Sequence, residues 1–310
     1  MNQLVFDLLP VFFLLGLGAR LGRTGFLSGA MIEGLKRVVA NIALPALLFV
    51  AFSRVHVDLW LMTLAGSVFL ACGVMGLVGW RVARRVCLPL PASAFLSQGF
   101  EAGMLGYALF SAAYGRSSLH HFAAADLGQV VYVFSVLMFQ LRRAEADKAS
   151  GSQGIVATML SSPVMLAIAG GLLAAVAFPG ASDSPWGERG ALMPLFNSLG
   201  AMTTPLVCLV VGFSLKDFRL EGLRQPLIFV VIRLVMAGCA GASIVLLLQQ
   251  VFPVDRRQVE AIMILFLLPP PFVIPVFRSA GADSEYIGNV LSSHTLLSIL
   301  AILLVVSAGR

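Results

Sequence analysis

Charged residues are scarce in this sequence. Only 12% of the 310 residues are Asp, Glu, Lys or Arg, whereas 59% are hydrophobic. Soluble globular domains carry about 25% charged residues, so this balance excludes an ordinary soluble domain. It predicts an integral membrane protein whose constant partner is the lipid bilayer.

Signatures of metal, redox and catalytic sites are also lacking. The four cysteines stand singly, without CxxC spacing, which argues against a zinc site or a disulfide framework. The four histidines have no metal-ligand spacing, and no HExxH, GxSxG or paired-aspartate motif occurs. We therefore expect no cofactor, no metal and no enzymatic activity.

A nucleic-acid partner is likewise not expected, although the formal net charge is +6. The basic residues stand at the ends of apolar runs, not in one patch with interleaved aromatic residues. Basic residues in such positions are typical of the flanks of membrane helices.

The sequence is rich in long apolar runs. A transmembrane helix needs about 20 apolar residues, and we count ten segments of this kind, two of them short or broken. In chain order they are 4–19, 38–52, 59–80, 90–110, 122–141, 155–178, 191–215, 226–251, 261–277 and 287–306. The sequence therefore predicts an all-α membrane protein with ten transmembrane helices.

The basic residues favour one orientation in the membrane. With the N-terminus outside, 14 Lys and Arg lie in cytoplasmic connections and 6 on the outer side, while Arg233 lies inside a segment. Cytoplasmic loops are enriched in Lys and Arg. We therefore expect a multi-pass protein of the cytoplasmic (inner) membrane with both termini outside.

The two halves of the chain place proline and glycine at matching positions. Pro45 and Pro205 correspond in segments two and seven, and the glycines of segment four correspond to a proline run in segment nine. Because each half has an odd number of spans, the second enters the membrane from the opposite side, as in the inverted repeats of many secondary transporters. We expect repeats at 1–141 and 155–310, joined by a cytoplasmic linker at 142–154.

Segment nine is interrupted by FLLPPPFVIP, residues 266–275. Successive prolines remove backbone donors and end the helix at about Leu268. In hydrocarbon such a break persists only inside protein or against a water-filled cavity, and we interpret it as the mark of a cavity. The half-helix that begins near Phe272 is expected to present unpaired N–H groups to an anion such as a carboxylate. We predict that the substrate site contains Pro269, Pro270, Pro271 and Phe272.

Segment four supplies the partner break in this interpretation. Gly103 and Gly106 tolerate non-helical backbone, although a GxxG pair also serves simply to pack helices. Glu101 lies roughly 15 Å deep, near the midplane, where a carboxylate is costly and usually functional. We predict that Glu101, Gly103 and Gly106 bind substrate and that Glu101, together with Arg233, couples proton movement to transport. The alternative is a structural ion pair between Glu101 and Arg233 of segment eight.

Several stretches, in this order, resemble the auxin efflux carrier family, which contains bacterial malonate-type transporters and plant PIN-type carriers. They are LLPVFFLLGLGARLGRTGFL, NIALPALLF, EAGMLG, IRLV with Arg233, and LLPPPFVIPVF followed by GADSEYIGNVLSSHTLLSIL. The resemblance implies a ten-helix inverted repeat whose segments four and nine cross at their breaks, and transport of a small organic anion or weak acid. It also implies that Asn41 and Pro45 belong to the site. The family typically has asparagine where this chain has Glu101.

Two other interpretations stay open at this point. A sodium-coupled bile-acid-type symporter shares this architecture but needs polar side chains around its crossovers, and residues 269–275 are almost wholly apolar. A non-transporting membrane receptor or sensor would bind its ligand in the same cavity. The sequence names neither the substrate nor the direction of transport, and it leaves open whether the chain forms a homodimer.

Overall fold

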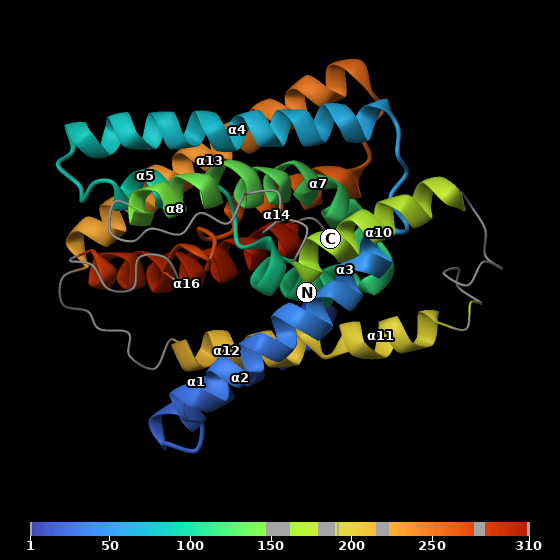
Figure 1. Ribbon diagram of the computed structural model, residues 1–310, viewed down its shortest axis with the longest axis horizontal. Coiled ribbons are helices and arrows are strands. Elements are labelled where there is room, and N and C mark those ends of the chain that lie inside the picture. The colour runs from blue at the N-terminus through green and yellow to red at the C-terminus, as the bar shows by residue number, and fades with distance from the viewer. Residues whose placement is uncertain are drawn as a thin grey trace. The chain divides into compact units, whose positions relative to one another are not determined.

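The computed structural model contains helices and no strands in the residues that it describes, which are 2–146, 162–178, 190, 192–214, 223–275 and 283–308 (Figure 1). Six helical stretches in this part of the chain are long and apolar enough to cross a membrane. They are Gly29–Phe52, Leu59–Arg85, Arg116–Leu141, Met193–Phe213, Arg224–Val251 and Glu285–Val306. The predicted all-α membrane class is confirmed, and six of the ten predicted spans have a matching helix.

The other four predicted spans are not among these six stretches. The first is α1 (Asn2–Arg23), and the sixth contains the apolar helix α10 (Pro163–Ala177), with residues 155–161 outside the described ones. Predicted segments four and nine are the two that break.

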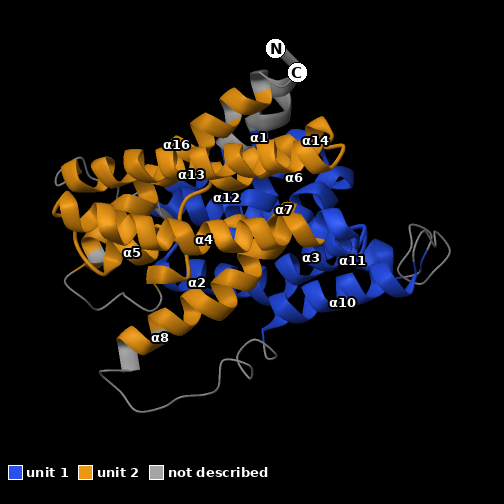
Figure 2. Ribbon diagram, turned by 90° about the horizontal axis from the view of Figure 1, so that it is seen from above, with its two compact units in different colours: residues 1–61, 103–124, 158–217 blue, residues 62–102, 125–157, 218–310 orange. Residues whose placement is uncertain are grey.

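The chain divides into two compact units, each assembled from separate stretches of sequence (Figure 2). Unit 1 comprises residues 1–61, 103–124 and 158–217, and unit 2 comprises residues 62–102, 125–157 and 218–310. Each unit therefore draws on both halves of the chain. The repeats at 1–141 and 155–310 stay a prediction, and most of the predicted linker at 142–154 lies outside the described residues.

Unit 1 is built mainly from the first two and the sixth and seventh predicted segments. Its helices are α1, α2 (Gly29–Val38), η1 (Val39–Ala43), α3 (Leu44–Phe52), α6 (Tyr107–Tyr114), α10, α11 (Met193–Ala201) and α12 (Thr203–Ser214). A π-helical turn, η2 (Ala102–Gly106), leads into α6.

Glycine sets the helix packing in unit 1. A Cβ on Gly18 of α1 would overlap the carbonyl oxygen of Leu209 in α12, and a Cβ on Gly212 of α12 would overlap the carbonyl oxygen of Leu15. A Cβ on Gly171 of α10 would lie 2.8 Å from a backbone oxygen of α3. The missing side chains let the backbones of α1 and α12, and of α3 and α10, come into direct contact.

Unit 2 holds most of α4 (Leu59–Arg85), α5 (Ala92–Leu96), most of α7 (Leu119–Tyr132), η4 (Val133–Leu137), α8 (Met138–Ala146), α13 (Arg224–Val251), α14 (Arg256–Leu267) and α16 (Ser284–Ala308). The helix α14 starts at a capping box formed by Asp255 and Gln258, which satisfies two otherwise free N–H groups. It stops before the proline run, because proline cannot donate the next backbone hydrogen bond.

Candidate functional site

The break in segment nine follows α14. Leu268 is the C-cap of this helix, with extended backbone, so the predicted end at about Leu268 is confirmed. Pro269, Pro270 and Pro271 are non-helical and buried, and helical geometry returns at Ile274. The continuation over residues 276–282 lies outside the described residues.

The break in segment four follows α5. This helix ends at Leu96, and residues 99–101 are non-helical. Gly99 has a φ of +65°, a conformation that favours glycine. A Cβ there would also lie 2.6 Å from a methyl group of Val133 and 3.0 Å from Cγ of Pro271. Gly99 is therefore the residue on which this break depends.

The glycines predicted to provide the non-helical backbone lie one turn later in the chain. Gly103 and Gly106 are part of the π-helical turn η2, and Gly106 is buried. They belong to the stretch of unit 1 that starts at residue 103.

The two breaks of unit 2 are bonded to each other. The backbone N–H of Glu101 donates to the carbonyl of Pro269 at 2.8 Å. The backbone N–H of Phe272 donates to the carboxylate of Glu101 at 2.5 Å. The structure thus brings together Glu101, Pro269 and Phe272, three of the residues predicted for the substrate site. However, the prediction of an unpaired N–H at Phe272 is wrong, because a carboxylate of the same chain binds it.

Arg233 of α13 connects the two breaks from a fully buried position. Its guanidinium donates to the carbonyls of Leu96 at 2.9 Å, Leu268 at 2.8 Å and Gly99 at 2.6 Å. Leu96 and Leu268 end the helices α5 and α14, where the helix dipole is negative and a cation is favourable. One positive charge therefore stabilises both helix ends.

Arg233 has two further contacts. Nη1 lies 3.3 Å from Nδ1 of His294 in α16, and the guanidinium lies over the ring of Phe100, 5.1 Å from its centroid, a favourable cation–π arrangement. The sequence had offered, as the alternative to a functional Glu101, a structural ion pair between Glu101 and Arg233. Its hydrogen bonds within the described part of the chain go instead to the three carbonyls and to His294.

Other side chains satisfy the remaining backbone groups of the breaks. The N–H of Phe100 donates to Oε1 of Gln129 at 3.2 Å, and Nε2 of Gln129 donates to the carboxylate of Asp126 at 2.8 Å. The hydroxyl of Ser298 donates to the carbonyl of Leu267 at 2.6 Å. Buried backbone groups need such partners, and here protein side chains provide them.

A second polar chain lies beside the segment-four break. Tyr132 donates from its hydroxyl to Oε1 of Gln98 at 2.6 Å, and Nε2 of Gln98 donates to Oε1 of Gln140 at 3.0 Å. Sequence reasoning missed these residues together with Asp126, Gln129 and His294. The available signal was polar and ionisable side chains within apolar runs.

The remaining predicted site residues belong to unit 1. Asn41 lies in η1, is exposed, and donates to the carbonyl of Arg37 at 2.8 Å. Pro45 lies in the first turn of α3. It cannot donate to the carbonyl of Asn41, and the helix widens there into a π turn. Their part in substrate binding stays a prediction.

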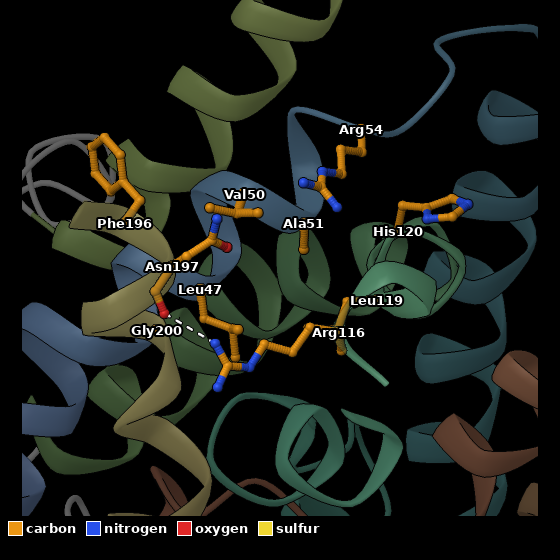
Figure 3. Close-up of a pocket in the computed structure, with 10 residues that line it drawn as sticks. All are labelled: Leu47, Val50, Ala51, Arg54, Arg116, Leu119, His120, Phe196, Asn197 and Gly200. Atoms are coloured by element: carbon orange, nitrogen blue, oxygen red, sulfur yellow. Dashed lines mark hydrogen bonds between the residues drawn. The ribbon is translucent and has the colours of Figure 1, made fainter. Parts of the chain in front are cut away.

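Unit 1 also contains a pocket between α3, α11 and the start of α7 (Figure 3). Its apolar floor includes Leu47, Ala51 and Leu119, and the guanidinium of Arg116 donates to the carbonyl of Asn197 at 3.1 Å. None of the residues predicted for the substrate site lines this pocket.

A helical membrane protein with two interlocked broken helices has the architecture of a membrane transporter, and comparison with known proteins gives its family. Residues 3–160 match the family model described as "Membrane transport protein", so the chain belongs to this family. The resemblance to auxin efflux carriers is thereby confirmed.

The curated relatives are transporters as well. The chain is similar to "Uncharacterized transporter YfdV" of Escherichia coli K12, with 22% identity over 281 residues that cover 86% of this chain and 84% of the relative. The proteins of the same name from Escherichia coli O157:H7 and Shigella flexneri match to the same extent.

Proposed function

We propose that this protein is a secondary transporter that moves a small organic anion or weak acid across the cytoplasmic membrane by alternating access. The observation that carries the proposal is the bonded pair of breaks in unit 2, where Glu101 contacts both Pro269 and Phe272. In secondary transporters the substrate binds between such discontinuous helices.

Helix contacts inside each unit support the ten-helix inverted repeat that this function requires. In unit 1, α1 packs on α12 and α10 packs on α3, which pairs segment one with seven and segment six with two. In unit 2, Gly79 of α4 faces Ser97 after α5, and Gly241 of α13 faces Phe266 of α14. These two contacts pair segment three with segment four, and segment eight with segment nine. These contacts correspond between the two halves, as an inverted repeat predicts.

The charge distribution favours an anionic substrate. Arg233 is fully buried, and three of its four hydrogen-bond partners are neutral carbonyl groups. A buried guanidinium bonded to neutral groups keeps its positive charge and attracts anions to its surroundings. Glu101 is the ionisable residue at the contact between the two breaks, and we assign it to the substrate site and to proton coupling.

A sodium-coupled symporter remains the second candidate, because Asp126 and Gln129 lie beside the segment-four break. Their oxygens already accept hydrogen bonds, Gln129 from Phe100 and Asp126 from Gln129. A sodium site would have to displace these donors, so we favour the proton-coupled organic anion transporter.

A binding screen on the purified full-length protein tests the proposal. We expect acetate, malonate or indole-3-acetate to raise the melting temperature, because a ligand at 100 times its Kd adds about 2.7 kcal/mol to the stability of the folded state. Glucose serves as the neutral control. Sodium and choline salts are compared, and stabilisation by carboxylates only in sodium would favour the symporter. Carboxylates without any effect would contradict the proposal. Uptake into proteoliposomes then separates a transporter from a receptor.

A further inference from the structure

The contact between Glu101 and Phe272 has the chemistry of a bound substrate. A carboxylate oxygen lies 2.5 Å from a backbone nitrogen, and Glu101 is only 8% exposed. A backbone N–H carries a single hydrogen to donate. Glu101 therefore occupies the amide that we predicted for the carboxylate of a substrate.

The backbone around Glu101 is held independently of this side-chain contact. Its own N–H donates to the carbonyl of Pro269 at 2.8 Å, and the preceding N–H, of Phe100, donates to Gln129 at 3.2 Å. Rotation of the Glu101 side chain breaks neither bond. The carboxylate can thus leave Phe272 while the two breaks stay joined.

The charge around the breaks limits what else can bind. The ionisable groups that unit 2 places there are Glu101 itself, Arg233 from α13, Asp126 and Tyr132 from α7, His294 from α16 and Cys72 from α4. Residues 266–275 contribute none. With both carboxylates ionised, their charges and that of Arg233 sum to −1. A substrate carboxylate makes this sum −2, and a proton on Glu101 restores it.

We propose that Glu101 is an internal competitor of the substrate: a substrate carboxylate binds the Phe272 amide when Glu101 has left it by taking up a proton. This inference rests on the proposed transport of organic anions. A substrate carboxylate at the same buried amide disfavours the ionised form of Glu101, so a proton enters with the substrate. An O–H bond forms on Glu101 with a proton from water, and it breaks when the substrate leaves. One proton accordingly moves with each substrate molecule whose carboxylate binds the Phe272 amide.

The test counts protons taken up when a carboxylate binds. Acetate, malonate and indole-3-acetate are added separately to the purified full-length protein in weak buffer at about pH 7.5, with a pH indicator, while binding is measured in parallel. We expect wild-type protein to take up about one proton per bound anion. Glu101→Gln should bind the anion without proton uptake, and its affinity should lose the pH dependence of the wild type.

Glu33→Gln is the matched control, since Glu33 is an exposed carboxylate in α2, and it should behave as wild type. Anion binding by wild type without proton uptake would overturn the inference and leave organic anion transport standing. Proton uptake by Glu101→Gln on anion binding would also overturn the inference. If wild-type protein binds none of the three anions, both this inference and the proposed function are wrong. The wild-type count does not depend on the folding of any variant.

Discussion

Nη2 of Arg233 donates a 2.6 Å hydrogen bond to the carbonyl oxygen of Gly99. Gly99 is the left-handed residue of the segment-four break, and the same guanidinium binds the C-cap of α14, at the segment-nine break. A single side chain of α13 thus holds both breaks of unit 2.

Arg233→Gln should therefore destabilise the protein. It leaves at least two of the three buried carbonyls without a donor, at about 1–3 kcal/mol for each, so we expect a loss on the order of 4 kcal/mol. Arg233→Lys should recover little, because an ammonium lacks the planar fork of donors. Thermal unfolding in detergent measures the effect. Arg224→Gln, in the exposed first turn of the same helix, is the control, and an equal fall in both variants would contradict this role.

Gly99→Ala should also be destabilising, for two separable reasons. Its positive φ costs a side chain about 1–2 kcal/mol, and the new Cβ would press on Val133 and Pro271. Gly25→Ala isolates the first effect, since Gly25 has a φ of +77° with open space around it. We expect the melting temperature to fall clearly further for Gly99→Ala than for Gly25→Ala. Equal shifts would show that the crossing of the breaks tolerates the methyl group.

Two glycines of α1 should respond in opposite directions. Gly18→Ala introduces a methyl group against the backbone of α12, whereas Gly16 has nothing within 4 Å. Alanine is favoured over glycine inside a helix by about 0.5–1 kcal/mol. We expect Gly16→Ala to be neutral or stabilising and Gly18→Ala to destabilise unit 1, as measured by thermal unfolding. Tolerance of Gly18→Ala would contradict the close packing of α1 on α12.

Gln129→Leu should weaken the segment-four break. The substitution removes the acceptor of the Phe100 N–H and a donor to the buried Asp126. An unsatisfied buried donor costs about 1–3 kcal/mol. Gln250→Leu, at the exposed end of α13, controls for the change of residue type. A loss of stability no greater than that of the control would mean that the Gln129 bridge contributes nothing.

The sequence was most informative where one residue type decides the local structure. Scarce charge gave the membrane class, and the prolines after Leu268 gave the end of α14, because both follow from backbone and solvation chemistry alone. The sequence did not predict which glycine of segment four has the non-helical backbone of the break. A glycine letter carries no φ value, and the break falls at Gly99, before Gly103 and Gly106.

The partners of the breaks were also beyond the sequence. Arg233 reaches carbonyls 35 to 137 residues away, and any buried carbonyl is an equally good acceptor, so nothing in the residue letters marks Leu96, Gly99 or Leu268. For the same reason Phe272 was expected to be unpaired. Its partner, Glu101, was recognised as important, but its contact with that amide depends on the crossing of the two segments.

Counterflow in proteoliposomes measures whether the breaks around Glu101 bind and move an organic anion, and whether Glu101 couples that movement to protons. Vesicles preloaded with unlabelled malonate, acetate or indole-3-acetate are placed in a trace of the labelled anion, with and without an imposed pH gradient. We expect counterflow by wild type and by Glu33→Gln, with accumulation that follows the pH gradient. Glu101→Gln should still exchange the anion but should not accumulate it in response to the gradient. Gradient-driven accumulation by Glu101→Gln at the wild-type level would contradict coupling through Glu101. Wild-type vesicles that exchange none of the three anions would contradict organic anion transport.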